Sequence, residues 1–305
     1  MIAGLLASSG AAAFTLNPVD DLNDILSYEF MRNAFVAGTI IAIVAGVVGY
    51  FVVLRGLSFA GHALSHIGYA GATGAVLLGV APIYGLLTFS IGAAMAMGGL
   101  GKRLYGRDVA IGVVMAFSLG LGQLFVGLYK GGGSSNQSIS ILFGQVFAIT
   151  PGDIGITVAI STITLGAMAI MYRPLLFASL DEDVAEARGV PVRGLGIAFL
   201  GVTGMAVAQS VQVTGVLLIF GLLVAPAAIS QRLTARPGRG IVCAIALAVA
   251  FTWTALILAY YTPYPMSFYL TTIAFAAYLA SRATAGRSRS PSQSAPVLAT
   301  PGLAS

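Results

Sequence analysis

The sequence predicts an all-α, polytopic membrane protein with about nine transmembrane helices (eight to ten). Of its 305 residues, 58% are hydrophobic and only 8% are charged, whereas a soluble domain is typically about a quarter charged. Apolar runs near the roughly 20 residues that a spanning helix requires recur along the chain. These runs cover residues 33–54, 58–79, 82–100, 108–128, 153–172, 194–211, 213–230, 240–260 and 264–281.

Three segments fall outside these runs. Residues 1–30 lack the basic start of a secretory signal, and we expect an extracytoplasmic segment that lies in the membrane interface. The run at 139–149 is too short to cross, so it re-enters from one side or lies in the interface. Residues 282–305 are rich in Ser, Pro and Ala without apolar periodicity, which predicts a disordered cytoplasmic tail. The transmembrane domain is therefore expected at 31–281.

The basic residues predict the orientation. With the N-terminus outside and the C-terminus inside, only Arg32 and Lys130 lie on the outer side. An excess of Lys and Arg in cytoplasmic loops is the usual bias. The basic residues are also scattered between apolar runs rather than clustered on one face, which argues against a nucleic-acid partner. The residues on the inner side are Arg55, Lys102, Arg103, Arg107, Arg173, Arg188, Arg193, Arg232, Arg236, Arg239, Arg282, Arg287 and Arg289.

Both histidines of the chain, His62 and His66, lie four residues apart in the run 58–79. In a helix they share an arc of about 100° with a set of hydroxyl side chains. Lipid cannot satisfy such a stripe, so it faces other helices or a water-filled path. Imidazoles at i and i+4 can reach one ion, and imidazole suits Zn, Fe, Ni and Cu. We therefore predict a metal site at His62 and His66, in preference to simple hydrogen bonding between helices. The candidate path-lining residues are Ser58, Ser65, Tyr69 and Thr73.

The polar insert LDEDVAEARGVPVR, residues 180–193, predicts a short helix between two spans. Asp181 can cap its N-terminus, Arg188 lies near its end, and Gly189 can take the left-handed position that follows. Two helical turns are not stable alone, so the helix needs a surface to dock on. From the residues alone, the insert is either a solvated loop or the point at which a soluble partner moves the membrane domain.

Pro226 lies inside the run 213–230 and predicts a kink in that helix, which is either static or a hinge.

Two stretches resemble the ABC-3 metal-ion permeases, the membrane subunits of zinc, manganese and iron ABC importers in the bacterial inner membrane. One is LRGLSFAGHALSHIGYAGATGAVLLG, and the other is LDEDVAEARGVPVRGLG followed by SVQVTGVLLIFGLLVAPAAIS. The resemblance implies a homodimer with a central cation path, a periplasmic metal-binding protein and a cytoplasmic ABC ATPase dimer. It also implies that the short helix is the ATPase-coupling helix. Its residues are Asp181, Glu182, Asp183, Val184, Ala185, Glu186, Ala187, Arg188 and Gly189.

The chain itself is not predicted to be an enzyme. It contains no GxxxxGK[ST] phosphate loop, so ATP hydrolysis is expected on a separate subunit. No permanently bound cofactor is expected, only the transported divalent cation. Many members of the family have Asp where His62 stands, and imidazole in place of carboxylate shifts preference toward Zn²⁺. We therefore predict zinc import, with Mn²⁺ or Fe²⁺ as the alternative cargo. A secondary metal carrier or channel without an ATPase is the rival function.

Overall fold

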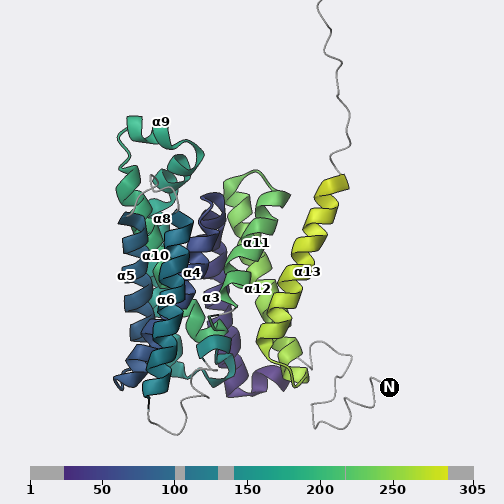
Figure 1. The fold of residues 1–305 in the computed structure, drawn as a ribbon. Helices are drawn as coiled ribbons and strands as arrows, with labels where there is room; N and C mark the ends of the chain where they lie inside the picture. Colours follow the sequence, from purple (N-terminus) through teal and green to yellow (C-terminus); the bar gives the residue numbers. More distant parts are fainter. Residues whose placement is uncertain (1–23, 100–106, 130–140, 217, 288–305) are drawn as a thin grey trace, which may run out of the picture.

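Long apolar segments separated by short polar or glycine-containing turns fold into an all-helical bundle. The computed structural model describes residues 24–99, 107–129, 141–216 and 218–287, and this part of the chain contains no strand (Figure 1). Each of the nine predicted runs overlaps one long helix. The elements are α3 (Glu29–Leu54), α4 (Ser58–Leu77), α5 (Pro82–Gly99), α6 (Arg107–Leu128), η1 (Val146–Ala148), α8 (Pro151–Leu180), α9 (Glu182–Ala187), α10 (Val192–Thr214), α11 (Ile219–Leu233), α12 (Pro237–Tyr261) and α13 (Met266–Arg287).

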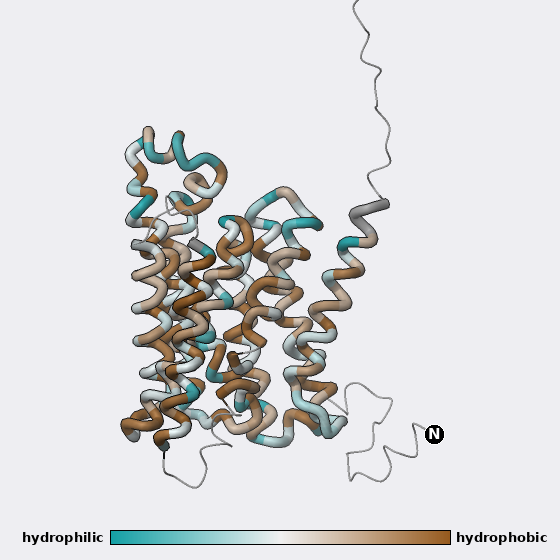
Figure 2. The backbone as a smooth tube through the Cα atoms, viewed as in Figure 1, coloured by the Kyte–Doolittle hydropathy of each residue, from teal (hydrophilic) through white to brown (hydrophobic). Residues whose placement is uncertain are grey.

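Six of these helices are long and apolar enough to cross a membrane, namely α3, α5, α6, α8, α10 and α12. Helix α11 is apolar but has 15 residues, about 22 Å, which is less than a 30 Å hydrocarbon core. Helices α4 and α13 are long enough but less apolar. Figure 2 shows hydrophobic residues along most of the bundle and polar residues at its ends. The all-helical class is confirmed, and the count of nine spans stays a prediction.

Three helix boundaries differ from the sequence prediction by six residues or more. Helix α8 has 30 residues and continues through Pro174 to Leu180, beyond the predicted end at 172. Helix α11 begins at Ile219 rather than 213, because the chain turns at Gly215, whose φ of 84° is left-handed. Helix α13 continues to Arg287, so the tail predicted from 282 was placed six residues too early. The residues 1–23 and 288–305 of the predicted terminal segments lie outside the described part.

Helix α4 packs mainly against α5 and α6. At Gly71 and Gly85 the backbones of α4 and α5 touch, because a Cβ built on Gly85 would lie 2.0 Å from the Gly71 carbonyl oxygen. One turn further along, Ser90 Oγ donates to the Leu64 carbonyl at 3.3 Å. Small residues permit this close approach, which is a common way of packing helices in membranes. The contact fixes the height and rotation of α4 within the bundle.

The segment predicted to re-enter lies against the connection between α10 and α11, over the part that is described (141–149). Its Gly144 has a φ of 82° and packs backbone to backbone on Gly215. The Val216 N–H donates to the Ile141 carbonyl at 3.3 Å, and Asn33 Nδ2 donates to the Ile149 carbonyl at 3.1 Å. These hydrogen bonds satisfy the backbone groups of a non-helical segment that would otherwise be costly to bury.

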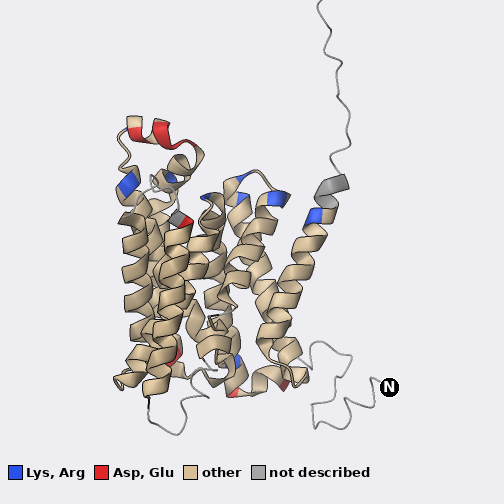
Figure 3. Cartoon of the chain, in the orientation of Figure 1, with Lys and Arg blue, Asp and Glu red and all other residues tan. Residues whose placement is uncertain are grey.

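Charged side chains mark the two ends of the bundle. Figure 3 shows the basic residues gathered mostly at the end that carries α9, where α8, α10, α11, α12 and α13 begin or finish. Helix α9 projects beyond the other helices at this end (Figure 1). The two ends therefore differ in charge, and the orientation itself stays a prediction.

Candidate functional site

The two histidine side chains converge on one point. Helix α4 places them one turn apart, and their Nε2 atoms lie 3.3 Å from each other. The ring centroids are 4.6 Å apart and the rings are nearly perpendicular, at 85°. Without a metal, this separation fits a hydrogen bond from one neutral imidazole to the other. The sequence prediction that both nitrogens reach a common point is met by the geometry.

The same separation fits two ligands of one cation. Metal–nitrogen bonds of about 2.0–2.1 Å place two ligand atoms about 3.3–3.4 Å apart at a tetrahedral angle and about 2.9 Å apart at a right angle. The observed 3.3 Å falls within this interval. Coordination would then use both Nε2 lone pairs, and each ring would carry its proton on Nδ1.

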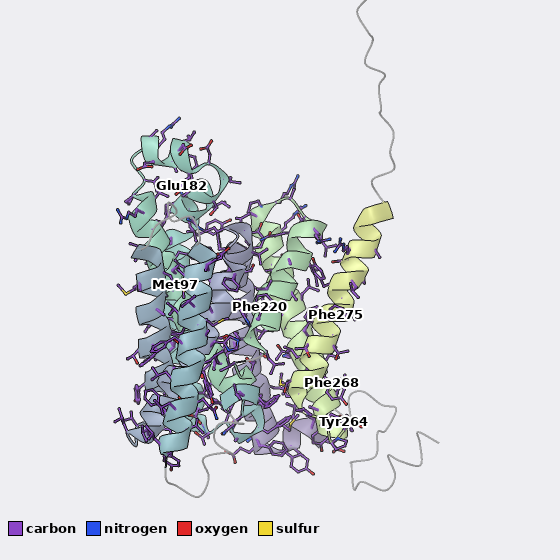
Figure 4. The ribbon with its side chains drawn as sticks, in the orientation of Figure 1. Met97, Glu182, Phe220, Tyr264, Phe268 and Phe275 are labelled. Atoms are coloured by element: carbon purple, nitrogen blue, oxygen red, sulfur yellow. The ribbon has the colours of Figure 1, made fainter. Side chains whose placement is uncertain are left out.

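The pair is partly to fully buried, and both Nδ1 atoms lack a hydrogen-bond partner. His66 is 8% exposed, and the Nδ1 atoms of His62 and His66 are buried without a hydrogen bond. The Phe220 ring of α11 lies 5.0 Å from the His62 ring, and Figure 4 shows Phe220 midway along the bundle. Histidine ligands in stable metal sites usually donate the other ring N–H to an acceptor. This pair lacks that support, which favours weak, transient binding.

The other residues of the predicted stripe are mostly engaged within α4. Ser65 Oγ donates to the His62 carbonyl at 2.7 Å, and Thr73 Oγ1 donates to the Tyr69 carbonyl at 3.0 Å. Tyr69 is buried with its ring against Gly122 of α6, whereas Ser58 is partly exposed at the start of α4. Their role in lining a path stays a prediction.

One chain does not complete a metal site within the described residues. No group of three or more His, Cys, Asp or Glu side chains that could hold an ion occurs there. A cavity of about 340 Å³ between residues 143–148, the α10–α11 connection and the start of α13 contains no histidine. Additional ligands for the histidine pair must come from water, hydroxyl or carbonyl oxygens, or a second copy of the chain.

The predicted short helix is present as α9, with the predicted caps. Asp181 Oδ1 accepts from the Val184 N–H at 3.0 Å, and Gly189 has a φ of 83°. Ala185 is fully buried in a small cluster with Ala178 of α8 and Val192 of α10. This cluster is the docking surface that a two-turn helix requires.

The opposite face of α9 is exposed. Val184 is 44% exposed, and Ala187 and Arg188 are also exposed, one turn further along the same side. Glu182 lies on α9 at the far end of the molecule (Figure 4). The helix therefore presents a mixed apolar and charged surface at the arginine-bearing end.

Some residues around the site were not predicted. Phe220 and Ser90 are apolar or small residues inside apolar runs, so only the three-dimensional packing reveals their contacts with α4. Arg55, counted only for orientation, joins the end of α3 to the hairpin that carries α9, because its Nη1 donates to Ser179 Oγ at 3.3 Å. Pro226 lies within α11, which stays helical around it, and its role as a kink stays a prediction.

Comparison with known proteins agrees with this arrangement. The chain is 32% identical over 224 residues to the manganese transport system membrane protein MntC of Listeria monocytogenes, covering 73% of this chain and 79% of that protein. It is 30% identical over 208 residues to the manganese import system permease protein ScaB of Streptococcus parasanguinis, covering 68% and 73% of the two chains.

A solved structure shares the fold. PsaBC from Streptococcus pneumoniae, in complex with Fab, superposes with a TM-score of 0.78 at 26% identity, over 86% of this chain and 94% of that one. The family match covers residues 27–285, nearly the whole helical bundle. With six apolar helices in the described part, the chain is a multi-pass protein of the cytoplasmic membrane. The chain belongs to the ABC 3 transport family.

Proposed function

We propose that this chain is the permease subunit of an ATP-driven importer that moves a divalent transition metal across the membrane. The observation that carries the proposal is the convergence of the His62 and His66 Nε2 atoms inside α4 of an ABC 3 family bundle. The cation is cargo, so it must bind and leave. Two imidazoles whose Nδ1 atoms have no hydrogen-bond acceptor suit that requirement better than a closed tetrahedral site.

The names of the two relatives support manganese as the cargo. Both named relatives are manganese systems, so the sequence-based preference for zinc is not supported. That preference rested on ligand chemistry alone, and imidazole does bind Zn²⁺ more tightly than Mn²⁺. Selection among metals in cells also depends on geometry and on metal availability. We infer Mn²⁺ as the main cargo, with discrimination made where the metal is delivered.

A second copy of the chain completes the path in this proposal. The described part of one chain offers two imidazoles and no third metal ligand of the usual types nearby. Two copies related by a two-fold axis would place one such pair on each side of a shared path if α4 faces the axis. Lipid would then cover the remaining apolar surface of the dimer.

Helix α9 is the proposed contact with a separate ATPase. It is mounted on α8 and α10 through Ala185, and it presents Val184, Ala187 and Arg188 outward. Arg55 connects the same hairpin to the residues that precede α4. Motion of α9 driven by ATP hydrolysis on the other subunit would therefore reach the helix that carries the histidines.

The proposed orientation follows the arginines. The end with α9 faces the cytoplasm, and the end with residues 141–149 faces an extracytoplasmic metal-binding protein. In this arrangement the N-terminus is outside, the C-terminus is inside, and eight long helices traverse the bilayer. The shorter α11 makes the ninth span together with the α10–α11 connection, which packs on residues 141–149.

Reconstitution into proteoliposomes tests the function and separates it from its rival. The chain would be purified with and without its partner ABC ATPase, and uptake of Mn²⁺, Zn²⁺ and Fe²⁺ would be measured with and without ATP. ATP-dependent uptake that disappears in His66→Ala, while size-exclusion profiles stay unchanged, supports the proposal. Uptake by the chain alone without ATP would instead establish a secondary carrier or channel.

A further inference from the structure

The cytoplasmic ends of α11, α12 and α13 carry a patch of arginines without nearby carboxylates. Arg232, Arg236, Arg239 and Arg282 are exposed there, and we refer to them as the arginine patch. No Asp or Glu follows Glu186 in the sequence. Figure 3 shows basic residues at these helix ends, whereas the acidic residues at this end of the molecule lie on the side of α9. The patch must therefore take its counter-charge from outside this half of the chain.

Aromatic and hydrogen-bond contacts orient part of the patch. The Arg232 guanidinium lies over the Tyr278 ring, with Cζ 5.0 Å from the centroid, and Nη2 donates to Tyr278 Oη at 3.2 Å. Arg282 follows Tyr278 by four residues, so both lie on the same side of α13. The contact joins α11 to α13 and brings these two arginines toward one face.

Exposed apolar side chains adjoin the arginines. Leu233 is 62% exposed beside Arg232, and Val242 is 66% exposed one turn along α12 from Arg239. Val242 lies deeper along α12 than Arg239, whereas Leu233 is the last residue of α11 and lies level with Arg232. Exposed apolar side chains level with and below charged helix ends match the boundary between lipid headgroups and acyl chains. An acidic soluble protein would neutralise the guanidinium groups but would leave Leu233 and Val242 in water.

We propose that the arginine patch binds the headgroups of anionic phospholipids in the inner leaflet. A phosphate diester supplies the acceptors that guanidinium groups bind in bidentate fashion, and its acyl chains cover the apolar side chains below. Bound lipid would hold the ends of α11, α12 and α13 together, on the far side of the molecule from α9. The proposal concerns lipid and does not depend on the identity of the metal.

The single cysteine of the chain provides the probe. Cys243 is free and partly exposed on α12, four residues and about 6 Å along the axis from Arg239. A fluorophore on Cys243 of the full chain would report quenching by brominated phosphatidylglycerol or brominated phosphatidylcholine in mixed vesicles. The fluorescence of the labelled parent chain should be quenched at a lower fraction of brominated phosphatidylglycerol than of brominated phosphatidylcholine. A salt concentration of about 0.5 M should weaken that preference.

Two double variants provide matched charge changes. Each arginine near the surface contributes about fivefold, so Arg236→Gln with Arg239→Gln should lower the preference for phosphatidylglycerol by roughly thirtyfold. Arg173→Gln with Arg193→Gln removes the same charge from exposed positions at the same end and should leave the preference within about twofold. Arg236→Lys with Arg239→Lys keeps the charge and should keep most of the preference for phosphatidylglycerol.

Three results would overturn the assignment. Equal quenching of the labelled parent chain by the two lipids would show that no anionic headgroup is preferred. This result depends on the parent chain alone. Equal losses in both glutamine variants would show that net charge alone acts. If Arg236→Gln with Arg239→Gln reduces binding of the ATPase subunit and leaves quenching unchanged, the patch contacts a protein.

Discussion

Replacing Gly85 by alanine should separate α4 from α5. The new Cβ would lie 2.0 Å from the Gly71 carbonyl oxygen and 2.5 Å from its carbonyl carbon. Restoring an ordinary contact of 3.4 Å requires the two helices to move apart by about 1.4 Å, because both groups belong to rigid backbone. Overpacking of this kind costs about 1–3 kcal/mol.

Gly92 of the same helix provides the control. A Cβ at Gly92 meets nothing within 4 Å. Gly92→Ala should therefore show only the gain in helix propensity, up to about 1 kcal/mol. The propensity gain is common to both variants, so Gly85→Ala should be less stable than Gly92→Ala by the overpacking cost of roughly 1–3 kcal/mol, which is on the order of 2–12 °C in unfolding midpoint.

Thermal unfolding of the two variants in the same detergent measures this difference. Metal uptake in proteoliposomes is the second measurement, since a shift of about 1 Å in α4 moves both histidines relative to α11 and should reduce uptake. Gly85→Ala with the same midpoint and uptake as Gly92→Ala would show that the backbone contact does not position α4.

Three further predictions follow from the site and from α9. His62→Asp replaces an imidazole by a carboxylate and should raise the ratio of Mn²⁺ to Zn²⁺ uptake in a competition assay; an unchanged ratio would mean that His62 does not contact the ion. Ala187→Glu alters the exposed face of α9, so it should abolish co-purification of the ATPase and leave the unfolding midpoint unchanged. Ala185→Glu places a carboxylate in a fully buried position, so it should lower the unfolding midpoint itself. Phe220→Ala uncovers His62 and should allow ATP-independent metal flux in proteoliposomes, while Phe275→Ala, which is 64% exposed on α13, should not; equal flux in both variants would rule out a covering role for Phe220.

The polar residues made the site predictable from the sequence. Two histidines at i and i+4 in an apolar run have few ways to be satisfied in a membrane, so their convergence could be expected. The caps of α9 were predictable for a similar reason, because Asp181 and Gly189 act on the backbone within a few residues of themselves.

The apolar and small residues carried much less information. Many glycines occur in the apolar runs, and nothing local distinguishes Gly85, which touches another backbone, from Gly92, which touches nothing. The start of α11 was misplaced because the run 213–230 is continuously apolar. The turn at Gly215 is set by its contact with Gly144, about seventy residues earlier in the sequence.

The weakness of the histidine site is part of how a manganese permease could work. A complete set of imidazole ligands would hold Zn²⁺ more tightly than Mn²⁺, and such an ion would leave slowly. In this chain only two imidazoles converge, and their Nδ1 atoms have no acceptor to raise ligand basicity. A proposed site of this kind would favour passage over retention, and a preference for manganese would have to be set before the ion reaches α4.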